Sequence, residues 1–308
     1  MSALKAQAEI LSLQCGRVNL QICAEAGGSI TRFYSQTDGS TIEWMRPAAI
    51  EDIDNRNPLG MSCFPLLPYS GRIRQGAFRF DGADIKLPLN FLPARHSIHG
   101  HGWQNAWKPV EQTANRLVIE YRHPPDEWIW EYVACQTFEL SADQLSVKIE
   151  LNNNSERPMP AGVGLHPYFP RTPESLVRAS TTHVWLADDE VMPVELSQDD
   201  LCSELDAGMY PHETAIDNVF TGWQGNAVIE WPEQDARLSI SATEDLAHLV
   251  VFSPAGETYF CVEPVSHCPD AFNLVTMGRR DTGMVVLQSG ESISSGMYFR
   301  IAENIRSG

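Results

Sequence analysis

The sequence has little basic charge. Its 308 residues include 22 Lys and Arg against 40 Asp and Glu, which gives a formal net charge of -18 at pH 7. A nucleic-acid-binding surface needs a basic stripe against the phosphates, and an anionic membrane surface attracts the same kind of charge. We therefore expect neither nucleic acid nor a membrane as a partner, whereas a neutral or cationic small molecule is compatible with this charge.

Long hydrophobic runs are also missing. No stretch approaches about eighteen apolar residues, and residues 1–21 lack the continuous apolar segment of a secretory leader. The seven cysteines are dispersed and form no C-x-x-C, so we expect reduced thiols that are buried as small apolar groups. Together these absences predict a cytoplasmic protein.

Helical periodicity is scarce, and alternation takes its place. In "LSVKIEL", Leu145, Val147, Ile149 and Leu151 point to one side and the polar residues between them point to the other. Similar runs are separated by Gly- and Pro-rich turns, no linker divides the chain, and no G-x-G-x-x-G follows a strand. The pattern predicts one all-β domain over 1–308, an antiparallel sandwich or barrel. A short helix is expected near "SQDDLCSEL", with Ser197 as its N-cap.

The stretch "HSIHGHGWQNAW" gathers three histidines, His96, His99 and His101. Alternate strand residues share a face, so the last two could chelate one ion. A cupin-type barrel adds a carboxylate a few residues later, but Gln104 stands in that region, and the intervening glycines indicate a turn. We expect no metal here. Covalent hydrolase chemistry is unsupported as well, because the chain has no G-x-S-x-G.

Four other polar residues stand within apolar segments. Glu263 follows the apolar run "YFCV", and a buried carboxylate is rarely left without a partner. His166 in "GVGLHPYFP" has the simpler interpretation of a core histidine, and Arg72 in "YSGRIRQG" that of a solvated arginine. Asp217 in "TAIDNVFTGW" is compatible with a turn or a cap. From the residues alone, structural and functional roles both stay open.

Five segments, taken in order, carry a family resemblance. "PYSGRIRQGAF", "HSIHGHGW", "GVGLHPYF", "AIDNVF" and "CVEPVSHCPDAFN" resemble segments of the aldose 1-epimerase (galactose mutarotase) family, from about residue 60 to 275. The resemblance implies a single large antiparallel β super-sandwich. It also implies interconversion of the α and β anomers of a free aldohexose without a metal or an organic cofactor. We expect a monomer or a homodimer, a choice that the sequence leaves open.

The resemblance assigns roles to individual residues. Glu263 matches the catalytic base, which would take the proton of the C1 hydroxyl, and His166 matches the general acid, which would protonate the ring oxygen. His96 matches a position that is often Asn or His, and Trp103 would lie against an apolar sugar face; His101 matches no functional position. The residues expected to bind the sugar are Arg72, His99, Asp217, His96 and Trp103.

One residue departs from the family pattern, and two other functions stay open. Gly71 stands where the family commonly has Asn before the arginine, which concerns the orientation of the substrate more than the chemistry. A hexose-6-phosphate 1-epimerase would need basic residues around the phosphate, for which Arg72, Arg74 and Arg79 are candidates. A non-catalytic sugar-binding or regulatory protein would not need an acid–base pair.

Overall fold

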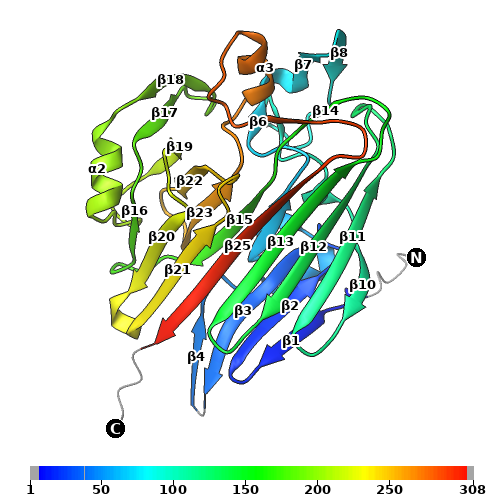
Figure 1. Ribbon diagram of the computed structural model, residues 1–308. Coiled ribbons are helices and arrows are strands. Elements are labelled where there is room, and N and C mark those ends of the chain that lie inside the picture. The colour runs from blue at the N-terminus through cyan, green and yellow to red at the C-terminus, as the bar shows by residue number, and fades with distance from the viewer. Residues whose placement is uncertain (1–6, 38, 304–308) are drawn as a thin grey trace.

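Antiparallel strands dominate the structure, a computed structural model that describes residues 7–37 and 39–303. Within these residues the strands form two large sheets and three two-stranded ones (Figure 1). The predicted all-β fold is confirmed. Residues 1–6, part of the stretch searched for a leader, lie outside the described residues.

The first large sheet has eleven strands in the order β1-β2-β3-β5-β15-β23-β22-β19-β17-β18, with β4 paired to β3. These strands are β1 (Leu11–Cys15), β2 (Val18–Cys23), β3 (Ser29–Thr37), β4 (Ser40–Glu43), β5 (Cys63–Leu66), β15 (Gly164–Pro170), β17 (His183–Ala187), β18 (Pro193–Ser197), β19 (Ile216–Thr221), β22 (His248–Ser253) and β23 (Tyr259–Val265).

The second large sheet has eight strands in the order β10-β11-β12-β13-β25-β21-β20-β16. They are β10 (Lys108–Gln112), β11 (Arg116–His123), β12 (Tyr132–Leu140), β13 (Gln144–Asn153), β16 (Leu176–Ala179), β20 (Asn226–Trp231), β21 (Ala236–Ala242) and β25 (Ser292–Glu303). The two-stranded sheets pair β6 (Arg72–Ile73) with β9 (Ser97–Ile98), β7 (Ala77–Phe80) with β8 (Ala83–Lys86), and β14 (Met159–Ala161) with β24 (Val285–Leu287).

The hydrophobic core joins the two large sheets. The alternation predicted for β13 is confirmed, since Leu145, Val147, Ile149 and Leu151 are all buried in it. On the first sheet, apolar residues such as Leu165 of β15 join the same core. Each buried side chain of this size contributes about 1.5–3 kcal/mol relative to an exposed one.

Strands β15 and β23 are buried on both faces. Leu165 and Phe169 of β15 belong to the core between the sheets, as do Phe260 and Val262 of β23. Because neighbouring side chains of a strand point to opposite faces, the residues between them lie on the other face of the sheet. That second face carries a separate buried cluster, which includes Tyr168.

The helices are short. They are α1 (Ile50–Asn55), α2 (Asp200–Ala207) and α3 (Ala271–Thr276), with single 3₁₀ turns η1 (Pro58–Gly60), η2 (Arg74–Gly76), η3 (Gly102–Gln104) and η4 (Pro232–Gln234). The predicted helix is α2, but its N-cap is not Ser197. Asp199 has that role, because its carboxylate accepts a hydrogen bond from the Leu201 backbone N–H, whereas Ser197 ends β18.

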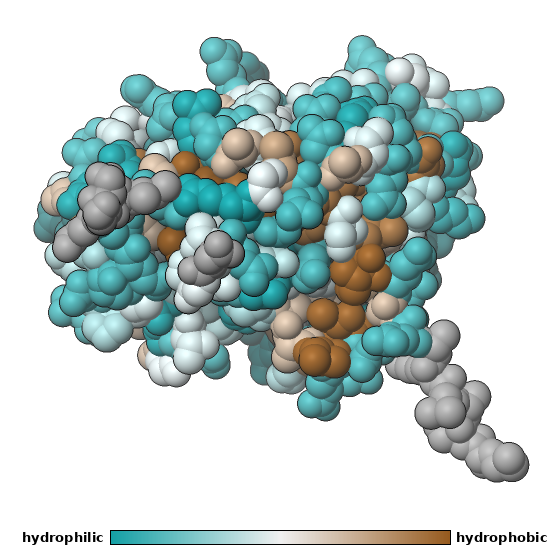
Figure 2. Space-filling model, turned by 90° about the horizontal axis from the view of Figure 1, so that it is seen from below, coloured by the Kyte–Doolittle hydropathy of each residue, from teal (hydrophilic) through white to brown (hydrophobic). Residues whose placement is uncertain are grey.

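The surface is mostly hydrophilic on the face shown in Figure 2, and the largest group of hydrophobic residues there lies toward the lower right. Over the described part of the chain, no helix has both the length and the apolar character needed to cross a membrane. The seven cysteines are free thiols, and five of them are buried, as the dispersed spacing predicts.

Candidate active site

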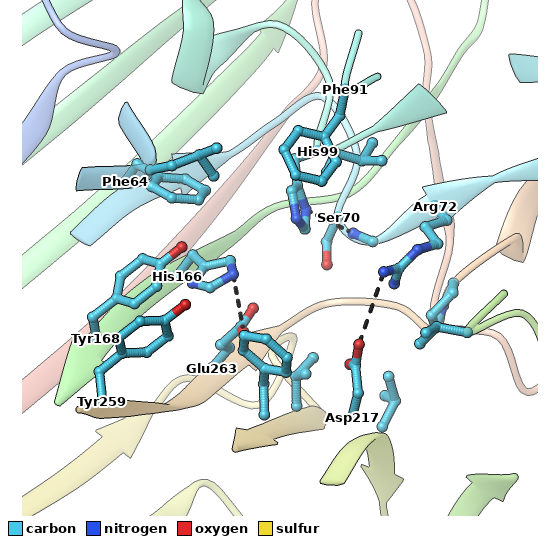
Figure 3. Close-up of a pocket in the computed structure, with 18 residues that line it drawn as sticks. Phe64, Ser70, Arg72, Phe91, His99, His166, Tyr168, Asp217, Tyr259 and Glu263 are labelled. Atoms are coloured by element: carbon cyan, nitrogen blue, oxygen red, sulfur yellow. Dashed lines mark hydrogen bonds and ion pairs between the residues drawn. The ribbon is translucent and has the colours of Figure 1, made fainter. Parts of the chain in front are cut away.

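A cavity of about 260 Å³ lies on the outer face of the first sheet. Its floor is formed by side chains of five adjacent strands, β5, β15, β23, β22 and β19. Its opposite wall comes from β6 and β9 and from the loops beside them. Segments from about residue 59 to 269 therefore meet at one place, as Figure 3 shows.

The strand register arranges the floor as a row. Backbone pairing sets His166 opposite Phe64 on one side. The pairs Gly164–Val265 and Tyr168–Cys261 fix the register of β15 with β23, and the same register brings His166 opposite Glu263. Beyond Glu263 the row continues with Val250 of β22. An imidazole and a carboxylate are therefore neighbours by sheet geometry, although their positions in the sequence are 97 apart.

The His166–Glu263 pair is in direct contact. Nε2 of His166 lies 3.3 Å from Oε1 of Glu263, and both side chains are buried (Figure 3). Burial lowers the pKa of His166 to about 3, an effect that the Arg46 and Arg72 charges reinforce. Burial also raises the pKa of Glu263 well above its usual value, and the nearby Asp217 carboxylate adds to this. Both shifts favour the neutral forms, an imidazole beside a protonated carboxyl, so burial opposes the charged His166 that the resemblance assumes.

His99 faces the pair from the opposite wall. Its ring centroid lies 5.5 Å from that of His166, and burial lowers its pKa well below the usual value. The Gly71 backbone N–H donates to Nδ1 of His99 at 3.2 Å. A neutral imidazole that accepts on Nδ1 carries its proton on Nε2. His99 is thus a fixed donor, suited to an oxygen of a bound sugar.

Arg72 and Asp217 occupy the far end of the cavity. The Arg72 guanidinium lies 3.8 Å from the Asp217 carboxylate, across the gap between β6 and β19 (Figure 3). Burial raises the pKa of Asp217, and Arg72 lowers it in part. Both residues line the cavity, so five of the seven predicted site residues come together there.

Trp103 and His96 do not line this cavity. Trp103 is only 2% exposed and stacks behind Phe64, with ring centroids 5.3 Å apart. His96 is buried too: Nδ1 accepts the Gln75 backbone N–H at 3.0 Å, and Nε2 lies 3.4 Å from the Glu190 carboxylate. Both side chains therefore support the cavity walls without reaching the cavity.

The aromatic part of the wall was not predicted. Phe64, Tyr168, Tyr259 and Phe91 line the cavity beside the His166–Glu263 pair. Tyr168 packs on His166 with ring centroids 4.7 Å apart. The signal for Tyr168 was present in the sequence, because it follows His166 by two residues on the same strand and so shares its face.

His101 lies in a different cluster, with His123 and Asp126. The two imidazole rings are stacked, with centroids 4.3 Å apart and an interplanar angle of 8°. The lone pair of an imidazole nitrogen lies in the ring plane, so two stacked rings do not direct their lone pairs at one ion. His123 instead contacts the Asp126 carboxylate at 3.2 Å, and Nδ1 of His101 contacts the Tyr132 hydroxyl.

Gly71 has a left-handed backbone, with φ of +62°. A Cβ at this position would lie 3.3 Å from Pro269, a tight but tolerable contact. Asn is among the residues that best tolerate this conformation. We expect Gly71→Asn to change the free energy of unfolding by no more than about 1 kcal/mol in a urea titration. Gly71→Val should cost clearly more, and equal values for both variants would contradict the backbone argument.

Known proteins resemble this chain over most of its length. The family model for aldose 1-epimerase matches residues 10–300. An uncharacterized Escherichia coli K12 protein, YphB, is 29% identical over 302 residues, covering 95% of this chain and 98% of its own. A second one, YihR, is 31% identical and covers 68% of this chain and 70% of its own.

Solved structures show the same fold. The crystal structure of an Escherichia coli K12 protein, provisionally assigned as an aldose 1-epimerase, has a TM-score of 0.85 at 28% identity and covers 96% of this chain and 99% of its own. A galactose mutarotase-like protein from Clostridium acetobutylicum has a TM-score of 0.86 at 21% identity, with coverages of 98% and 97%. The chain belongs to the aldose 1-epimerase family.

Proposed function

We propose that the protein is an aldose 1-epimerase that interconverts the α and β anomers of a free, uncharged aldohexose. The observation that carries this proposal is the buried His166–Glu263 pair, in contact at 3.3 Å on the floor of a cavity. Sugar binding alone does not need an acid and a base in contact. Family membership supports the same reaction class.

The reaction moves one proton in each direction. Opening the ring removes the proton of the C1 hydroxyl, breaks the C1–O5 bond and adds a proton to O5. Glu263, as the carboxylate, takes the first proton, and His166, as the imidazolium, gives the second. Transfer of a proton within the pair generates this form from the neutral one. After rotation about C1–C2, the reverse transfers close the ring to the other anomer, and the pair still holds one proton.

This scheme predicts the pH dependence of kcat/KM. The active pair holds one proton. The pair takes up a second proton only near the lowered pKa of His166, about 3, so kcat/KM falls as the pH decreases toward that value. The pair loses its one proton above the raised pKa of Glu263, so kcat/KM also falls as the pH increases past that pKa. Initial rates in dilute buffer should not fall as the pH is lowered from neutrality to about 5. A fall toward low pH centred near 6.5, the usual histidine pKa, would contradict the lowered pKa of His166.

The charge of the cavity favours a substrate without phosphate. Arg72 is the one arginine or lysine among the described residues that line it, and the Asp217 carboxylate lies 3.8 Å away. Arg74 contacts Asp270, and Arg79 contacts Asp84, so the other two candidates for phosphate binding have carboxylate partners elsewhere. A phosphate group in this cavity would be repelled by the Asp217 carboxylate, which already faces the one arginine.

The proposal is tested by polarimetry on freshly dissolved α-glucose, α-galactose and α-glucose 6-phosphate. We expect the protein to accelerate the decay of optical rotation for at least one free sugar and to do so poorly for the phosphate. A higher kcat/KM for the phosphate would favour a hexose-6-phosphate 1-epimerase. Measurable sugar affinity without any acceleration would favour a non-catalytic binding protein.

A further inference from the structure

We propose that His267 is a positioning residue of this site, which orients the Ser70–Arg72 segment and thereby fixes the tautomer of His99. The role in catalysis rests on the proposed function; the contacts do not. His267 does not line the cavity and is only 2% exposed. It follows Glu263 by four residues, just after the end of β23.

The tautomer of His267 is set by two backbone groups. Its Nδ1 lies 2.7 Å from the carbonyl oxygen of Cys268, which can only accept, so Nδ1 carries the proton. Its Nε2 therefore accepts, and the Ser70 backbone N–H donates to it at 3.1 Å. Burial lowers the pKa of His267 to about 4, so the ring stays neutral and this acceptor persists near pH 7.

The next backbone N–H reaches the cavity wall. Directly after Ser70, the Gly71 N–H donates to Nδ1 of His99 at 3.2 Å. Two consecutive amides thus bind two histidines, one behind the wall and one in it. Only the φ and ψ angles of Ser70 separate these two planar amides, so while the Ser70 backbone keeps its conformation the direction of the first amide sets that of the second. His267 in this way helps to keep the His99 proton on Nε2, where it faces the cavity.

The same segment is fixed at a second point. The Asp270 backbone N–H donates to the Arg72 carbonyl oxygen at 2.7 Å. The Asp270 carboxylate, 4% exposed, accepts the Arg74 backbone N–H at 2.9 Å. The segment after Glu263 therefore binds the segment that carries Arg72 on both sides of that residue, which ties a sugar-binding arginine to the catalytic strand.

The His267 ring has little freedom to move. A Cβ on Gly162 would lie 1.9 Å from Cδ2 of His267, so the ring occupies the space that a side chain at 162 would need. Packing of this density transmits a change at His267 to its hydrogen-bonding partner. A substitution at 267 must therefore keep the volume of the side chain if it is to report on the hydrogen bond.

His267→Gln and His267→Met form a matched pair, since both side chains have similar length but only glutamine supplies an acceptor for the Ser70 N–H. We expect His267→Met to raise KM for the free sugar about tenfold with a smaller effect on kcat, and His267→Gln to stay within about threefold of the wild type. Equal KM values for the two variants, or a loss of thermal stability with KM unchanged, would overturn the proposal.

The tautomers are measured independently of activity, by ¹⁵N NMR of protein labelled at histidine, with His99 identified through His99→Gln. In the wild type we expect the proton on Nδ1 of His267 and on Nε2 of His99. In His267→Met the His99 signals should shift toward a mixture of tautomers. A wild-type His267 protonated on Nε2, or an unchanged His99 in the variant, would refute the positioning role even if mutarotation is observed. If the His99 tautomer shifts in His267→Met but the wild-type protein catalyses no mutarotation, the proposed function is refuted and the positioning role stands.

Discussion

Replacing Glu263 with glutamine is expected to lower kcat for anomer interconversion by a factor of about 10²–10⁴. The amide keeps the size of the carboxylate and cannot take the proton of the C1 hydroxyl. His166→Asn should have an effect of similar size, because it removes the other member of a pair in contact at 3.3 Å. Sugar affinity, measured by calorimetry, should change far less in either variant.

The two substitutions should not be additive. When two residues transfer protons as one unit, replacing either of them removes most of what the unit contributes to kcat. The double variant should therefore be little slower than either single variant. Glu150→Gln, on the second sheet and paired with Lys148, is a matched control that should leave the rate unchanged. A double variant whose loss equals the product of the two single losses would contradict a shared role.

Gly100→Ala is expected to destabilise the protein by at least ~3 kcal/mol. Gly100 has φ of +67°, and a Cβ there would lie 2.2 Å from the Leu67 carbonyl oxygen. That carbonyl accepts the backbone N–H groups of both His101 and Gly102, so the clash would displace the turn that carries His99. Activity should fall together with stability.

Gly16→Ala separates strain from clash. Gly16 also has a left-handed backbone, with φ of +59°, but its Cβ would have no neighbour within 4 Å. Gly16→Ala should therefore lower the free energy of unfolding only by the strain of alanine in a left-handed backbone, about 1–2 kcal/mol. Urea titrations of both variants give the comparison, and equal losses would mean that the contact with Leu67 is not what requires glycine at position 100.

Local periodicity was enough to predict the fold class. The alternation in β13 is visible in the sequence because side chains of a strand point to opposite faces, and the buried row at 145, 147, 149 and 151 follows from it. The helix cap was missed by two residues because Ser197 and Asp199 are both good N-caps. Which of them is used depends on where β18 ends, and that is a tertiary feature.

The candidate site needed more than periodicity. Its residues lie on strands that are distant in sequence, so only the family resemblance connected them. Trp103 and His96 were predicted to contact the sugar, since an aromatic ring or an imidazole looks the same in sequence whether it lines a cavity or supports one from behind. Their burial depends on Phe64 and Glu190, which other segments supply.

The protonation state of the His166–Glu263 pair also could not be predicted from the sequence. A carboxylate next to an imidazole suggests a charged pair, but burial on both sides of β15 and β23 acts on both groups in the opposite direction. Burial of this extent depends on the register of five strands and on the wall formed by β6 and β9. The family resemblance predicted that His166 and Glu263 belong to one site, and the structure adds that burial favours their neutral forms.

The most direct test of the central claim is exchange NMR of the two anomers of a free aldose at equilibrium, with wild-type protein, Glu263→Gln and His166→Asn. We predict exchange between the α and β C1–H signals that depends on wild-type protein concentration and is absent with either variant at the same concentration. Full exchange with both variants would contradict the assignment of acid and base. No exchange with the wild type, for any free or phosphorylated aldose tested, would contradict the proposed function.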